Sequence, residues 1–158
     1  MKKIIISTLF GIIICSCNNK NSKEIPNEVI VIVELVKNKD KSEEELKKFT
    51  KRYSDYVKST EPNTLGWTYH DAGDKIILIE RYKDEDANII TAKNISPGGN
   101  RYKLLQESFD YHSLEKVTVI GGFTQKLVDF NKMTAEKVGF TAPFLYYPLI
   151  SGYSKNLK

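Results

Sequence analysis

The chain has 158 residues, a formal net charge of +4 and only two cysteines, Cys15 and Cys17. Such a small charge gives no reason to expect a nucleic-acid partner. Because both cysteines stand near the start, the rest of the sequence offers no thiol nucleophile, redox pair or thiolate metal site. The two histidines have no carboxylate cluster beside them in the sequence, so we expect no catalytic metal.

Residues 1–16 have the pattern of a signal peptide. Two lysines precede an apolar run over residues 4–14, which is too short for a bilayer span of about 20 residues. The run ends in I-C-S-C at positions 14–17, which resembles the lipobox of bacterial lipoproteins. That resemblance implies cleavage before Cys17 and attachment of lipid to its thiol, and the asparagines that follow favour the outer membrane of a bacterial cell envelope. The alternative is an ordinary signal peptide cut near Ser16.

The remaining chain begins with a tether and then shows the pattern of one domain. We expect residues 17–27 to be the lipidated cysteine and a polar tether, because they show no apolar periodicity. The β-branched run Val29–Val36 predicts a strand with two apolar faces. Ser42 and Glu45 have the spacing of a capping box, which opens a helix that ends before Pro62.

The later elements complete a βαββαβ order. They are strands over 65–70 and 75–82 joined by the hairpin turn D-A-G-D, a helix over 84–93 that breaks at 96–99 and resumes over 101–111, and a strand over 116–121. This order predicts an α+β domain over residues 28–122 with a ferredoxin-like antiparallel sheet. Residues 123–158 form a C-terminal extension with a short helix around 125–137 and an aromatic-rich segment over 140–153. We expect this extension to cover apolar surface on its own domain or on a neighbour.

The two helices of a ferredoxin-like domain cover only one face of its sheet. The predicted strand Val29–Val36 is apolar on both faces, and the strand over 76–82 is nearly so. A large apolar sheet face left in water is unusual. We therefore expect a homodimer whose two copies pack sheet to sheet.

Three motifs resemble those of the antibiotic biosynthesis monooxygenase family: E-P-N-T-L-G at 61–66, W-T-Y-H at 67–70 and E-R-Y-K-D-E-D-A at 80–87. The resemblance covers roughly residues 29–121. It implies a dimeric α/β barrel that oxidises a small aromatic molecule, such as a quinol or a phenol, without a cofactor. Asn63 departs from the family's usual glycine, and Thr91 stands where many members place a histidine that faces the cavity.

Oxygen chemistry without a cofactor needs a cavity that desolvates the substrate and stabilises its anion. Strand alternation places Trp67 and Tyr69 on one face and His70 on the other. Glu80 and Tyr82 also share a face, which we expect to line the cavity because a helix-packed face should be purely aliphatic. The catalytic candidates are Glu80, Tyr82 and His70, and the substrate-binding candidates are Trp67, Tyr69 and Thr91.

Each candidate also has a purely structural interpretation. The two aromatic candidates suit a core or a dimer contact, and His70 suits a solvated turn. Glu80 and Arg81 suit an ion pair at the barrel rim that is shared across the dimer, and His112 suits a helix end, where a cation is favoured. Three functions therefore remain: a cofactor-independent monooxygenase, a non-catalytic ligand-binding or stress-associated envelope protein, and a purely structural dimer.

Overall fold

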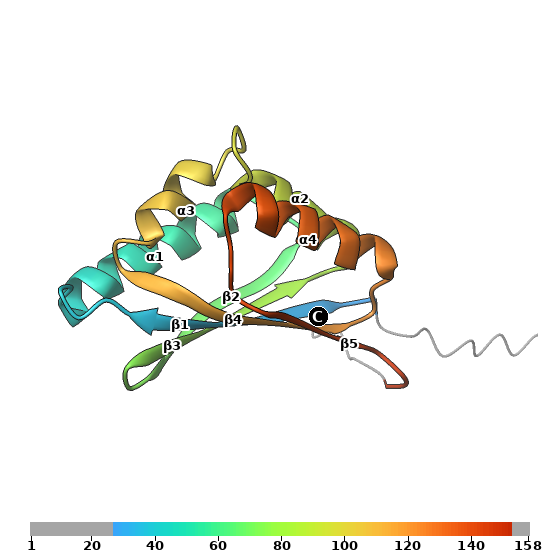
Figure 1. Cartoon of the computed structure of the whole chain (residues 1–158), viewed down its shortest axis with the longest axis horizontal. Helices are drawn as coiled ribbons and strands as arrows, with labels where there is room; N and C mark the ends of the chain where they lie inside the picture. Colours follow the sequence, from blue (N-terminus) through green and yellow to red (C-terminus); the bar gives the residue numbers. More distant parts are fainter. Residues whose placement is uncertain (1–26, 153–158) are drawn as a thin grey trace, which may run out of the picture.

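The computed structural model describes residues 27–152, so the predicted signal peptide, Cys17 and nearly all of the tether lie outside the described residues. The chain forms two layers, a sheet and a set of helices that lie on one of its faces (Figure 1). The elements in chain order are β1 (Val29–Lys37), α1 (Glu43–Thr60), β2 (Thr64–Ala72), β3 (Lys75–Tyr82), α2 (Glu85–Ile95), α3 (Tyr102–Ser108), β4 (His112–Gly121), α4 (Gln125–Val138) and β5 (Phe144–Pro148). Within residues 27–152, no helix is long and apolar enough to cross a membrane.

The sheet has the strand order β2-β3-β1-β4-β5. Its first four strands pair antiparallel, so the α+β class and the ferredoxin-like order agree with the prediction. The sheet extends beyond the four predicted strands, because β5 pairs with β4 in parallel. α4 carries the chain back across the helical layer after β4, and such a crossover makes the next strand parallel (Figure 1). The aromatic extension therefore adds a strand to the sheet.

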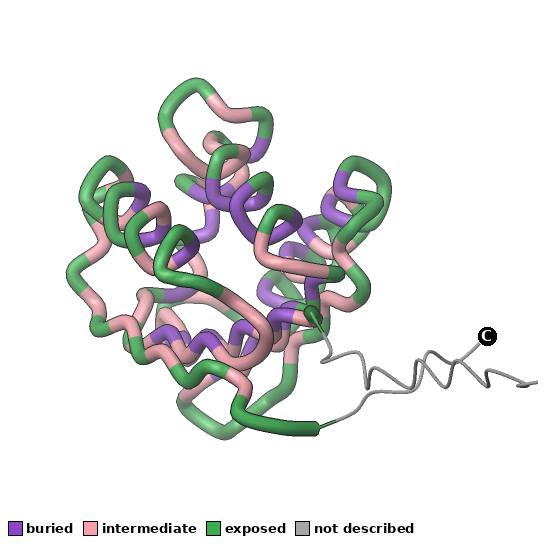
Figure 2. The backbone as a smooth tube through the Cα atoms, turned by 90° about the vertical axis from the view of Figure 1, so that its right-hand side faces the viewer, coloured by how far each residue is buried: buried purple, intermediate pink, exposed green. Residues whose placement is uncertain are grey.

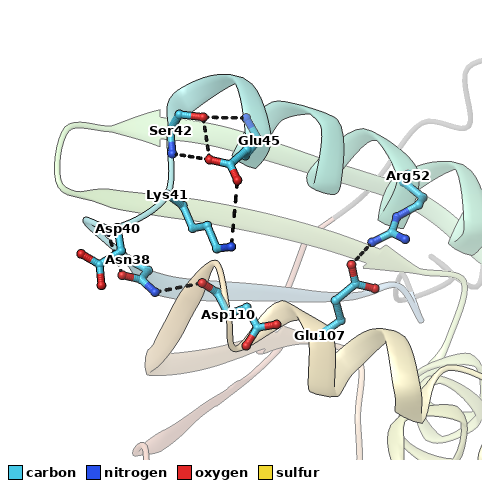
Figure 3. Close-up of polar contacts among 8 residues, drawn as sticks. All are labelled: Asn38, Asp40, Lys41, Ser42, Glu45, Arg52, Glu107 and Asp110. Atoms are coloured by element: carbon cyan, nitrogen blue, oxygen red, sulfur yellow. Dashed lines mark hydrogen bonds and ion pairs between the residues drawn. The ribbon is translucent and has the colours of Figure 1, made fainter.

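α1 begins with the predicted capping box (Figure 3). Ser42 Oγ accepts a hydrogen bond from the Glu45 backbone N–H at 3.2 Å, and Glu45 Oε2 accepts one from the Ser42 N–H at 2.9 Å. Further along the helix, Arg52 forms an ion pair with Glu107 of α3 (Figure 3). This contact links α3 to α1 at the surface.

The loop between α2 and α3 is closed by tight backbone contacts. A Cβ on Gly99 would lie 2.3 Å from the carbonyl oxygen of Asn94, so only glycine fits there. The same oxygen accepts a hydrogen bond from the Arg101 backbone N–H at 2.9 Å. The predicted helix break over 96–99 is therefore confirmed, and the loop brings the Arg101 side chain into the interior, where it is 1% exposed.

Both faces of the central strands carry apolar residues, as predicted, and one of them also carries Glu34 and Arg81. Buried residues gather between the sheet and the helices (Figure 2), and the sheet's share of this core includes Val29, Val31, Val33, Leu35, Leu78, Tyr82 and Val119. We use "open face" for the opposite side of the sheet. Its central apolar residues are Ile30, Ile32, Ile77, Ile79 and Ile120. The helices of the described chain all lie on the other side (Figure 1).

Candidate functional site

A cavity of about 130 Å³ lies between the helices and the helix-facing side of the sheet. Most of its wall is aliphatic or aromatic, which is typical of sites for small molecules. An apolar cavity of about 150 Å³ is large enough to bind benzene, so this space suits a single aromatic ring. The titratable or hydroxyl-bearing side chains in the wall include Tyr53, Tyr69, Glu80, Thr91, Arg101 and His112.

Glu80 provides the cavity with a carboxyl group whose charge is poorly solvated. It stands on β3, is 9% exposed, and accepts a hydrogen bond at Oε2 from the Tyr82 hydroxyl at 2.5 Å. Burial raises the pKa of Glu80 to about 7, against the lowering effects of the Tyr82 hydrogen bond and the Arg101 charge. Glu80 therefore gains and loses its proton near neutral pH.

Arg101 faces the cavity from the loop before α3. Its guanidinium carbon lies 4.9 Å from the ring centroid of Trp67 and 5.5 Å from that of Tyr53. The two rings stack on each other with centroids 5.6 Å apart. A guanidinium held against two aromatic faces is stabilised by the cation–π interaction and restricted in orientation.

Glu61 neutralises Arg101 from the segment between α1 and β2. Its Oε1 lies 3.1 Å from Arg101 Nη1, and it is 4% exposed. The same carboxylate accepts hydrogen bonds from the Thr91 hydroxyl at 2.5 Å and from Asn94 Nδ2 at 3.0 Å. Thr91 thus lines the cavity, as the substrate-binding prediction requires, but its hydroxyl proton is directed to Glu61.

Trp67 and Tyr69 lie on β2 and line the cavity beside Glu80. The face of β3 that carries Glu80 is therefore the cavity side, as predicted. The reason given for that prediction is wrong, since this face is the helix-packed one and it still carries a carboxyl and a phenol. The cavity interrupts the packing between the two layers, so polar groups can occupy that face.

One of the predicted roles does not fit the geometry. His70 is exposed, and its Nε2 lies 3.0 Å from the Thr68 hydroxyl oxygen, on the face of β2 that points away from the cavity. Arg81 donates a hydrogen bond from Nε to Glu28 at 2.6 Å and does not pair with Glu80 within the chain, so an ion pair of these two residues across a dimer stays a prediction. Neighbouring residues on a strand point to opposite faces, which separates Arg81 from Glu80.

His112 differs from its expected place at the end of a helix. It is the first residue of β4, lines the cavity and is 6% exposed. Burial lowers the pKa of His112 to about 4, so the ring is neutral at pH 7 and no cation stands there. Among the described residues, neither ring nitrogen has a hydrogen-bond partner.

No family model matches the sequence, and no curated protein matches it. The fold does have a counterpart among solved structures. The crystal structure of MupZ from Pseudomonas fluorescens superposes with a TM-score of 0.62, covering 82% of this chain and 95% of MupZ. The two sequences are 16% identical over this match, so the likeness to MupZ shows a shared fold.

The sequence did not predict that three residues belong to this site: Arg101, Glu61 and His112. Glu61 opens the E-P-N-T-L-G motif, but nothing local shows that its side chain is buried. Arg101 follows a glycine-rich loop, which is normally exposed.

Within residues 27–152, no group of three or more histidine, cysteine, aspartate or glutamate side chains could hold a metal ion.

Proposed function

We propose that the chain is a cofactor-independent monooxygenase, similar to the antibiotic biosynthesis monooxygenases, that acts on a small quinol or phenol. The observation that carries this proposal is Glu80, a buried carboxyl with a pKa of about 7 in the wall of a largely apolar cavity of single-ring size. A general base works best when its pKa is close to the working pH. Glu80 belongs to the motif at 80–87 and lines the cavity, and Glu61 belongs to the motif at 61–66 and pairs with Arg101 of the cavity wall.

In the proposed reaction, Glu80 accepts a proton from a hydroxyl group of the bound substrate. The resulting phenolate is electron-rich and transfers electrons to O₂. A hydroquinone and O₂ then yield a hydroxyquinone and water, with one oxygen atom entering the ring and the other leaving as water. Tyr82 donates a hydrogen bond to the Glu80 carboxylate, and Arg101, whose charge Glu61 balances, offers N–H donors to the substrate anion.

The test is oxygen uptake by the full chain, purified in detergent, with a panel of single-ring hydroquinones. Uptake should exceed the autoxidation blank and fall at least about tenfold in Glu80→Ala, because general-base catalysis contributes at least that much. Tyr82→Phe should also lower uptake, whereas His70→Ala is the matched control and should not. Uptake at the blank with every hydroquinone would refute the catalytic proposal.

A second candidate function is binding without turnover. Its support is Thr91, which occupies the position of the family histidine and directs its hydroxyl to Glu61 instead of to the cavity. A binder would show an increase in melting temperature with the hydroquinones while oxygen uptake stays at the blank. The same variants then distinguish a cavity ligand from one bound elsewhere.

We also propose that two copies associate through the open face. Five isoleucines stand at its centre, and burying apolar area of this kind favours association by about 25 cal/mol per Å². Sheet-to-sheet pairing of this kind would give the dimeric barrel that the family resemblance implies. Anchoring in the bacterial envelope through Cys17 is a further part of the proposal and rests on the sequence alone.

A further inference from the structure

The cavity holds hydrogen-bond donors that have no acceptor. Within the described residues, Arg101 Nε, Arg101 Nη1 and Trp67 Nε1 are buried and make no hydrogen bond. Leaving a buried donor unpaired destabilises the fold, and more so when the group is charged. Buried polar groups in native proteins almost always have a partner, so these three donors indicate that an acceptor is missing from this part of the cavity.

The protein itself is poorly placed to provide that acceptor. Arg101 Nη1 lies 3.1 Å from Glu61 Oε1, but the angle does not make a hydrogen bond. Glu61 is already the acceptor for Thr91 and Asn94. Glu61 therefore neutralises the charge of the guanidinium and leaves its N–H groups free. Arg101 is 1% exposed and lies against two aromatic rings, so it cannot turn out to water.

We infer that Arg101 and the indole N–H of Trp67 bind the carboxylate of a single-ring aromatic acid whose ring occupies the apolar part of the cavity. A carboxylate supplies two oxygens with several acceptor sites, which suits three N–H donors on two side chains. The ring lies against Val33 and Leu78 of the sheet. This inference rests on the proposed function in one respect, that the cavity binds a small aromatic molecule, and it narrows the substrate to a carboxylated quinol or phenol.

The charges around the site determine how binding of an acid depends on pH. Glu61 and Arg101 cancel each other, so the carboxylate of a ligand is opposed mainly by Glu80 when that residue is ionised. The other titratable groups that face Glu80 or line the cavity are Tyr82 on β3, Tyr53 on α1, Tyr69 on β2 and His112 on β4. Burial holds the tyrosines protonated and the histidine neutral at pH 7, so none of them adds charge. An acid should therefore bind more tightly at pH 6 than at pH 8, with uptake of a proton by Glu80.

The test compares benzoate with benzamide, which has nearly the same shape and no charge. Titration calorimetry with the full chain in detergent should show benzoate binding about tenfold more tightly at pH 6, since a hydrogen bond to a charged group contributes about 1.5–3 kcal/mol. Trp67→Phe keeps an aromatic ring, removes the N–H and should weaken benzoate binding severalfold. Arg101→Gln should bring the two affinities within about twofold of each other. His70→Ala, on the other face of β2, is the control and should change neither affinity.

The outcomes separate this inference from the proposed function. Equal affinities for benzoate and benzamide in the unmodified chain would overturn the inference and mean that water satisfies the three donors. If hydroquinone is oxidised while 2,5-dihydroxybenzoate neither binds nor reacts, the acid subsite fails and the monooxygenase proposal stands. If no aromatic compound binds, both fail. Since Arg101→Gln leaves Glu61 unpaired and can fail to fold, the comparison of ligands and the Trp67→Phe variant decide the matter without it.

Discussion

Replacing Glu80 with glutamine should change how the stability of the fold depends on pH. Burial raises the pKa of Glu80 to about 7 from an ordinary value of 4.5, and at about 1.4 kcal/mol per pKa unit this corresponds to about 3 kcal/mol. Below pH 4.5 the carboxyl is protonated in both the folded and the unfolded chain. As pH rises toward 7, the unfolded chain loses the proton and the folded chain keeps it, so the folded state is progressively destabilised.

The lowered pKa of His112 changes the pH dependence of stability in the opposite direction, so its effect must be separated from that of Glu80. Burial lowers the pKa of His112 to about 4 from an ordinary 6.5, so its contribution to stability is complete above pH 6.5 and falls as pH decreases toward 4. Both the unmodified chain and the Glu80→Gln variant keep His112. The difference between their free energies of unfolding therefore cancels it and reports Glu80 alone.

The assay is urea denaturation of both proteins between pH 4.5 and pH 8, analysed as a two-state transition. The free energy of unfolding of Glu80→Gln, relative to the unmodified chain, should rise by about 3 kcal/mol across this range. Any constant difference caused by the altered Tyr82 hydrogen bond does not affect this slope. Glu44→Gln makes the same substitution at an exposed carboxyl on α1, away from the cavity, and is the control. A flat difference for Glu80→Gln would show that the carboxyl is not desolvated, and the argument for Glu80 as a base would fail.

Three other changes test separate parts of the structure. Gly121→Ala should destabilise the fold by at least about 2 kcal/mol in urea denaturation, because its φ is +126° and a Cβ would lie 2.1 Å from the Glu28 carbonyl oxygen; unchanged stability would contradict this geometry. Ile79→Glu should place a charge at the centre of the open face and give a monomer by light scattering, whereas the unmodified chain should give the proposed dimer; the same mass for both proteins would rule out this interface. Cys17→Ser should remove lipid from the intact protein, measured by mass spectrometry of the membrane fraction, and a lipid that persists would place the anchor elsewhere.

The fold was predictable where local signals are strong. The capping box at Ser42 and Glu45 marked the start of α1, and the turn residues Asp71–Asp74 marked the β2–β3 hairpin. β5 was not predicted, because Phe144–Pro148 is a short strand without alternation. Its pairing with β4 is created by tertiary structure, since α4 must first bring the two segments together.

The site was predictable in part, for the same reason. Alternation along β2 and β3 correctly grouped Trp67 with Tyr69 and Glu80 with Tyr82. Arg101 could not be placed, because its burial depends on Glu61, which lies 40 positions earlier in the chain. His112 was misplaced because the predicted helix was extended to residue 111, while α3 ends at Ser108 and β4 follows after a short turn. A residue at a junction between two elements changes its surroundings completely when the boundary moves by a few positions.

The added fifth strand also determines where this molecule is protected against uncontrolled polymerisation. An unpaired strand edge exposes N–H and C=O groups that can recruit a strand of another chain. β5 covers β4 over Val117–Gly121, and the part of β4 beyond this pairing, His112–Lys116, carries charge at Glu115 and Lys116. β5 is itself five residues long and ends in Pro148, which has no N–H to donate. Fibre growth through this side of the sheet is thereby suppressed, which lets the chain keep an apolar sheet face without extending strand by strand.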